Sequence, residues 1–152
     1  MSRRESGYFL RMRARDSEID KQGFVYHAHY VTYFDTALTE YLREIGHDYA
    51  GQVRTTGTDF HVVKVLVEYR EPIEFDQEFD VHVRVGRIGN TSLTFKLEIH
   101  PPARDRAIAV GEVVWVHADQ QTHRPTPLPR QLVALLKKDI ESHDRSLDGS
   151  NC

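Results

Sequence analysis

The stretch that decides the fold, residues 28–45, reads AHYVTYFDTALTEYLREI. Its apolar residues recur at spacings of three and four, which is the period of one face of a helix. Gly46 follows the last of them and suits the left-handed backbone that ends many helices, and Arg43 lies where the helix dipole favours a cation. We therefore predict one long helix that ends before Gly46. Its apolar stripe consists of Tyr30, Phe34, Ala37, Leu38, Tyr41, Leu42 and Ile45.

The segments on either side of this helix have the period of strands. A short mixed run precedes it, and a polar connection that contains Gly51 and Gly57 follows it. After that connection Val63, Val65 and Val67 are expected on one face of the next strand. Gly89-Asn90 is typical of a hairpin, and Gly111 indicates a bulge or a close backbone approach. The predicted strands are residues 8–15, 61–69, 78–88, 91–100 and 107–119.

The C-terminal part predicts an extended exit and a short helix. Pro125, Pro127 and Pro129 enforce the exit, and leucines predict a helix from about residue 129 to 138. Residues 141–152 are polar and are expected to fray. The element order predicts an α+β fold with an antiparallel β-sheet wrapped around one long central α-helix. We expect an N-terminal tail over residues 1–7, a single domain over 8–138 and a polar C-terminal tail over 139–152.

Composition bounds the class of protein. The 152 residues carry 20 Lys and Arg against 23 Asp and Glu, so no basic excess points to a nucleic acid partner. A hydrophobic fraction of 39% gives a thin core that another subunit could complete. Cys152 is the one cysteine, which excludes an internal disulfide and a site of several thiolates. With no signal-peptide core and no apolar run of roughly 18 residues, we expect a cytoplasmic protein with no membrane partner.

The most informative segment lies just before the long helix, at residues 16–30. It holds a carboxylate (Asp20), a glycine turn (Gly23) and two polar aromatic residues (Tyr26 and His27). The first N–H groups of a helix have no acceptor within it and point outward with the positive end of the dipole. An acyl carbonyl oxygen there would meet an oxyanion hole, and Asp20 could activate water or attack the carbonyl. This pattern fits thioester hydrolysis.

Each of these residues also has a structural interpretation. Asp20 could cap the turn before Gly23, and Tyr26 could be a core aromatic with a satisfied hydroxyl. His27 and His29 form an H-x-H pair, but on a helix they would lie about 200° apart. No third ligand is within sequence reach, so we predict no metal site.

The segment also carries a family pattern. Asp20, Gly23, Tyr26, His27 and Tyr30 occur in order, followed by Phe34, Thr39-Glu40 and Leu42, then Val67-Glu68-Tyr69, Pro72, Gly89, Thr91-Ser92, Phe95, Gly111 and the run from Arg124 to Pro129. This combination resembles the acyl-CoA thioesterases of the hotdog fold, and more narrowly the branch with hydroxybenzoyl-CoA thioesterase and the YbgC-type enzymes. The resemblance extends from about residue 8 to 138.

The resemblance implies a role for each site residue and an assembly. Asp20 is the catalytic carboxylate, the His27 N–H polarises the thioester carbonyl, and the Tyr26 and His27 side chains line the pocket. The working unit is a homodimer with sheets joined edge to edge and active sites between subunits, and dimers often pair into a homotetramer. The substrate is an acyl-CoA, and neither a metal nor an organic cofactor is implied.

For the CoA portion, the resemblance points to the bend at Gly89, Asn90, Thr91 and Ser92, with Arg87 close in sequence. Arginine can pair with phosphates at the protein surface, although an arginine on a solvent face is often only hydrated. The chain departs from the family in two places. His29 replaces the usual Asn, and Glu18-Ile19-Asp20 replaces Asp-Thr-Asp or Asp-Cys-Asp.

We therefore expect an acyl-CoA thioesterase that releases a free carboxylic acid and CoA. Two alternatives stay open at this point. A hotdog dehydratase acting on acyl chains would use a His on the helix paired with an acidic residue from the partner subunit, and His27 and Glu40 are the residues that keep this alternative open. A catalytically silent acyl-CoA or acyl-carrier binding module would need no carboxylate facing a thioester, so Asp20 argues against it.

Overall fold

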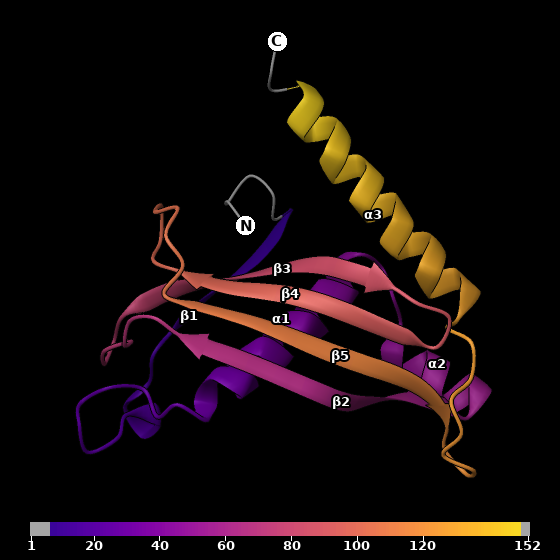
Figure 1. Ribbon diagram of the computed structural model, residues 1–152, viewed down its shortest axis with the longest axis horizontal. Helices are drawn as coiled ribbons and strands as arrows, with labels where there is room; N and C mark the ends of the chain where they lie inside the picture. Colours follow the sequence, from indigo (N-terminus) through magenta and orange to yellow (C-terminus); the bar gives the residue numbers. More distant parts are fainter. Residues whose placement is uncertain (1–6, 150–152) are drawn as a thin grey trace.

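The computed structural model describes the backbone of residues 7–149 and the side chains of residues 7–144 (Figure 1). Within these residues, five strands form one antiparallel sheet with the order β1-β3-β4-β5-β2. The strands are β1 (Tyr8–Arg13), β2 (Thr58–Tyr69), β3 (Glu78–Ile88), β4 (Ser92–His100) and β5 (Ala109–Asp119). Cys152 and all of the predicted N-terminal tail except Gly7 lie outside the described residues.

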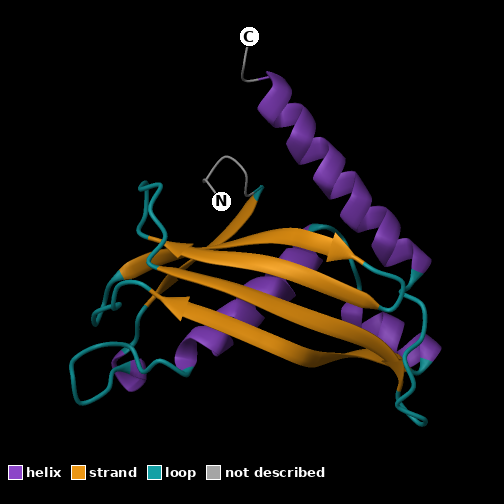
Figure 2. Cartoon of the chain, in the orientation of Figure 1, coloured by secondary structure: helices purple, strands orange, loops and turns teal. Residues whose placement is uncertain are grey.

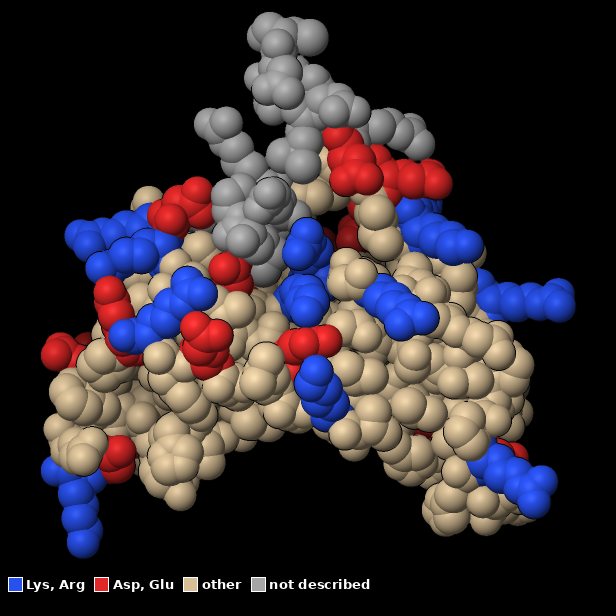
Figure 3. All heavy atoms as spheres, viewed as in Figure 1, with Lys and Arg blue, Asp and Glu red and all other residues tan. Residues whose placement is uncertain are grey.

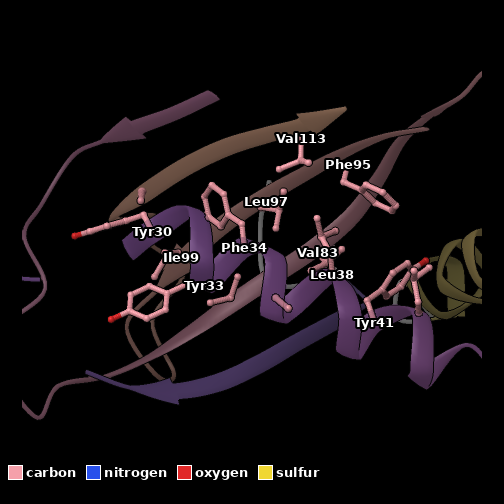
Figure 4. Close-up of a cluster of buried hydrophobic side chains, with 14 of the residues drawn as sticks. Tyr30, Tyr33, Phe34, Leu38, Tyr41, Val83, Phe95, Leu97, Ile99 and Val113 are labelled. Atoms are coloured by element: carbon pink, nitrogen blue, oxygen red, sulfur yellow. The ribbon is translucent and has the colours of Figure 1, made fainter. Parts of the chain in front are cut away.

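The long helix α1 (His29–Glu44) lies against one face of the sheet, as Figure 2 shows. Its buried side chains point at the strands because they share one face of the helix (Figure 4). They are Tyr30, Tyr33, Phe34, Ala37, Leu38, Tyr41 and Leu42. Gly46 follows with a φ of 89°, as its position in the sequence indicated. The predicted α+β fold with a sheet around one long helix is confirmed.

Gly111 on β5 lets α1 approach the sheet closely. A Cβ at this position would overlap the Phe34 ring and also crowd the Leu66 carbonyl oxygen. Of the two interpretations of Gly111, the close approach is correct. The bulge lies instead on the neighbouring strand, where the register with β5 shifts between Val62 and Lys64.

That shift corrects the prediction for β2. Val63 falls at the bulge and leaves the pattern expected with Val65 and Val67. β2 is an edge strand, and several of its apolar side chains are half exposed or more: Val62, Val63 and Leu66 are 54, 58 and 50% exposed. Val67 alone of the predicted valine set packs against the core. A long apolar edge strand of this kind is a ready template for pairing with another chain.

Two helices differ from the sequence prediction. The connection predicted as polar coil contains α2 (Tyr49–Thr56), which Asp48 caps by accepting from the Gly51 N–H and which ends at Gly57 with a φ of 67°. The C-terminal helix α3 (Arg130–Gly149) does not end near residue 138. The buried Tyr41 hydroxyl donates to Asp139 Oδ2 at 2.8 Å, which fixes α3 to α1 just before the residues that we expected to fray.

The face of the sheet turned away from α1 carries charges of both signs (Figure 3). Lys64 and Lys96 lie 3.5 and 3.3 Å from the same oxygen of Glu112 on β5. Within residues 7–149 no helix has the length and hydropathy needed to cross a membrane. Among the same residues, no three His, Cys, Asp or Glu side chains gather closely enough to hold a metal ion.

We predict that Gly111→Ala destabilises the protein by about 2 kcal/mol or more, because the added methyl forces the Phe34 ring out of its position. Urea unfolding followed by circular dichroism measures the loss. Gly86→Ala is the matched control, since its Cβ would meet mainly the flexible Lys96 side chain. Equal losses for both variants would show that the α1 contact has no special role.

Candidate active site

The loop before α1 is held in shape by its own backbone. A 3-10 turn, η1 (Asp16–Glu18), leads to a tight turn in which Asp20 N–H donates to the Phe24 carbonyl at 2.8 Å. Gly23 completes this turn with a φ of 86°, which an L side chain rarely adopts. Isolated bridges join Ile19 to Val25 and Phe24 to Glu74. The loop is therefore a short folded-back ribbon and not an open segment.

The Asp20 carboxylate has one oxygen engaged in this turn. Its Oδ1 accepts from the Gln22 N–H at 2.8 Å and, more weakly, from the Phe24 N–H at 3.5 Å. Asp20 therefore does cap the turn, as its structural interpretation predicted. Within the described residues Oδ2 accepts no hydrogen bond, so the half-buried side chain can cap the turn and still present one oxygen to a reactant.

The start of α1 presents two N–H groups. Tyr26 N–H donates to the Glu18 carbonyl at 2.9 Å, whereas the His29 and Tyr30 N–H groups donate back to the carbonyls of Tyr26 and His27. Those of His27 and Ala28 donate to no acceptor among the described residues. They lie at the positive end of the helix dipole, where an anionic oxygen is favoured.

Asp20 and His27 line one shallow hollow of about 300 Å³. Its lining also includes the aromatic residues Tyr30 and Tyr69 and the charged residues Arg70 and Glu71. The structure therefore brings together two of the predicted catalytic residues. The hollow is also lined by Gln22, Phe24, Val25 and Pro72.

Tyr26 lies beside the hollow and does not line it. Its ring is 45% exposed and contacts the imidazoles of His27 and His29, with centroids 4.5 and 5.7 Å apart. It is thus not the core aromatic of the structural interpretation. His29 occupies the first position of α1 and shares this aromatic cluster.

Tyr69 belongs to the hollow and was not among the predicted site residues. Its hydroxyl donates to the His27 carbonyl oxygen at 2.8 Å, and its ring packs edge-on against Tyr30 and His27. Burial raises the pKa of Tyr69. The available signal was the Val67-Glu68-Tyr69 motif, but sequence alone does not place the end of β2 beside the start of α1.

Glu18 is a buried carboxylate that ties the loop together. Its side chain accepts from the Arg15 N–H at 2.8 Å and from Arg15 Nη2 at 3.3 Å, while its own carbonyl accepts from Tyr26. Burial raises the pKa of Glu18, but the Arg15 N–H, the Tyr33 hydroxyl and the Arg15 guanidinium together outweigh it and lower that pKa. Burial, and after it the neighbouring Glu18 carboxylate, raise the pKa of Tyr33.

The predicted CoA-binding bend lies at the other end of the sheet (Figure 1). Its backbone has structural bonds there: Gly89 N–H donates to Ser92, Asn90 accepts from Leu128, and Thr91 accepts from His117. Arg87 is exposed beside it. A single chain therefore does not bring Arg87, Asn90, Thr91 and Ser92 to the Asp20 hollow.

A larger hollow, of about 630 Å³, lies between the C-terminal end of α1 and α2. Its lining includes Trp115 and Leu42 together with Asp35, Arg43 and Tyr49. The predicted dehydratase partner Glu40 lies on this half of α1, where it pairs with Arg43. His27 and Glu40 are therefore separated by most of the helix within one chain.

Comparison with known proteins identifies relatives over most of the chain. The family model described as the thioesterase-like superfamily matches residues 14–136. The acyl-CoA thioester hydrolase YbgC of Escherichia coli O6:H1 is 32% identical over 122 residues, which are 80% of this chain and 89% of that protein. The resemblance inferred from the sequence motifs is thereby confirmed.

Solved structures give the same result for the fold. The PA5185 protein of Pseudomonas aeruginosa superposes with a TM-score of 0.79 at 28% identity, covering 90% of this chain and 94% of that one. The 1,4-dihydroxy-2-naphthoyl-CoA thioesterase Slr0204 of Synechocystis superposes with a TM-score of 0.80 at 12% identity, covering 86% and 95%. The second similarity concerns the fold alone.

We predict that Glu18→Gln lowers the free energy of unfolding by about 1–3 kcal/mol at pH 7, because the neutral amide keeps one acceptor oxygen but loses the charge and the second oxygen that accept from Arg15. A lowered pKa in the folded state stabilises the protein above the ordinary value of 4.5, and this contribution disappears as the pH falls through the lower folded value. The difference between the two proteins should therefore shrink in acid. Unfolding series from pH 7 to pH 3 test this, and a difference that stays constant would contradict it.

Proposed function

Since this chain belongs to the thioesterase-like superfamily, we propose that it is an acyl-CoA thioesterase, which hydrolyses a CoA thioester to a free carboxylic acid and CoA. The observation that carries the proposal is local. A carboxylate, Asp20, and the N–H groups at the start of α1 lie beside one hollow, where a thioester carbonyl can meet both.

The single-domain boundaries of residues 8–138 and the cytoplasmic location stay predictions.

In the proposed reaction the thioester oxygen accepts hydrogen bonds from the N–H groups at the start of α1, that of His27 first among them. These groups stabilise the negative charge that develops as the carbonyl carbon becomes tetrahedral. The Asp20 carboxylate takes a proton from water, and the hydroxide oxygen bonds to that carbon. Collapse of the intermediate breaks the carbon–sulfur bond, and the CoA thiolate leaves and takes up a proton.

A second route uses the same groups. The Asp20 carboxylate oxygen bonds directly to the carbonyl carbon, CoA leaves as thiolate, and water then cleaves the mixed anhydride. Both routes need one carboxylate oxygen that is not engaged in the turn. The N–H groups of the turn donate to Oδ1, and Oδ2 is the oxygen that can react. Tyr26 and the His27 ring, exposed at the edge of the hollow, are proposed to orient the acyl group.

We further propose that the active unit is a homodimer joined along β2. The strand is 12 residues long, lies at the edge of the sheet, and carries apolar side chains that are half exposed or more. A second copy related by a two-fold axis would add its own β2 in antiparallel orientation. A homotetramer built from two such dimers stays a prediction.

This pairing accounts for the distance between the two parts of the site. Ser92 pairs with Val116 on β5, and Val116 pairs with His61, so the CoA-binding bend lies near the Thr58 end of β2. In an antiparallel pair, that end of one chain meets the Tyr69 end of the other. We propose that the bend and Arg87 of one subunit hold the CoA of a thioester cleaved by Asp20 of its partner.

Two other functions are separated by one measurement. A silent binding module would bind acyl-CoA and release no thiol, and a dehydratase would remove water from a hydroxyacyl chain and leave the thioester intact. Free-thiol release from acetyl-, hexanoyl-, palmitoyl- and benzoyl-CoA therefore tests the proposal. Thiol release from any of them supports it, and binding with no release contradicts it.

We predict that Asp20→Asn lowers kcat at least about 100-fold, the size expected for loss of a general base or nucleophile. The amide oxygen can still cap the turn at Gln22, so the fold is retained. Asp16→Asn, at an exposed position of the same loop, is the matched control. Nearly full activity in Asp20→Asn would exclude the carboxylate role.

We predict that the double variant Val62→Asp, Leu66→Asp halves the molar mass in solution or reduces it further, because it buries charge at the paired edge. Light scattering after size exclusion measures the mass, and thiol release should fall with it. Phe75→Glu, an equally exposed apolar residue outside β2, is the control. A wild-type chain that runs as a monomer would rule out the proposed assembly.

A further inference from the structure

We infer that Tyr69 is a positioning residue: its hydroxyl fixes the peptide between His27 and Ala28 so that the N–H groups at the start of α1 face the thioester oxygen. This inference rests on the proposed thioesterase function. It adds to that function a residue on β2 that acts through the backbone of another element.

The contact joins two elements far apart in the sequence. Tyr69 is the last residue of β2, and its hydroxyl donates to the His27 carbonyl at 2.8 Å, 42 positions away. The same carbonyl also accepts from the Tyr30 N–H, but at the longer distance of 3.3 Å. Tyr69 therefore supplies the shorter of the two bonds that hold this carbonyl oxygen.

Holding this carbonyl also orients an N–H group. In a trans peptide the C=O and the following N–H point in opposite directions, and the described chain contains no cis peptide bond. The His27 carbonyl points along the helix, so the Ala28 N–H points back from its start. The preceding peptide has the same direction, because the Tyr26 carbonyl accepts from His29. Two N–H groups thus leave the helix start side by side.

The position of Tyr69 suits this task. Its ring lines the Asp20 hollow, with Tyr30 4.8 Å and His27 6.3 Å away between centroids. Tyr30 is 2% exposed and belongs to the core, so one side of the Tyr69 ring rests on a rigid neighbour. Tyr69 itself is 47% exposed in the single chain, so it is not a core residue.

Removal of the hydroxyl alone separates positioning from packing. Tyr69→Phe keeps the ring contacts with Tyr30 and His27 and removes the bond to the carbonyl. An oxyanion donor must be aligned with the transition state, and small misplacements cost rate much more than they cost substrate binding. We expect kcat for the best-cleaved acyl-CoA to fall about 10- to 100-fold, with KM changed less than about threefold.

The experiment compares wild type, Tyr69→Phe and Tyr8→Phe in steady-state thiol release. Tyr8 lies on β1 at the opposite edge of the sheet, so its variant loses a hydroxyl far from the site and should keep wild-type kcat. Thermal midpoint and molar mass are measured on all three proteins. The selective fall in kcat, with both of these unchanged, supports the inference.

Other results overturn it. An unchanged kcat in Tyr69→Phe shows that the hydroxyl does not position the N–H groups, and a rise in KM alone makes Tyr69 a substrate contact instead. A fall in kcat that accompanies loss of the dimer assigns the effect to assembly. A wild-type protein that cleaves no thioester removes the proposed function and this inference with it, whereas an active wild type with an equally active Tyr69→Phe removes the inference alone.

Discussion

The close packing of Phe34 on Gly111 is the contact on which the rest of the molecule depends. Because no Cβ separates them, α1 lies directly against β5, and the buried face of the helix meets the sheet along its length. α1 begins at His29, in the stretch just before Phe34. The N–H groups at that point then lie beside the Asp20 turn and the end of β2, which meet in one hollow.

The spacing of apolar residues predicted most of this fold, because that spacing shows directly which face of a helix or strand is buried. The apolar spacing of α1 and the alternation of β3 and β4 gave bounds within one residue of those observed. The failures have physical causes of another kind. α3 is tied to α1 by a long-range bond from Tyr41 to Asp139, and α2 is bounded by its caps at Asp48 and Gly57. Neither feature shows as a spacing of apolar residues in the sequence.

The candidate site divides in the same way. Asp20 and His27 are close in sequence, so the turn and the helix start could be predicted together. Tyr69 reaches them only through the sheet, and the Gly89–Ser92 bend does not reach them within one chain at all. A pattern along one sequence cannot show either contact. The exposed edge of β2 connects both observations, since it carries Tyr69 and offers the surface for a second copy.

The account therefore requires that one thioester contact two subunits and the start of one helix. The most direct test is a crystal structure of Asp20→Asn with the acyl-CoA that the wild type cleaves best. We expect the thioester oxygen within about 3 Å of the N–H groups of His27 and Ala28, with the CoA against the Gly89–Ser92 bend of the partner subunit. A thioester bound away from the start of α1, or CoA held entirely by one chain, would contradict the account.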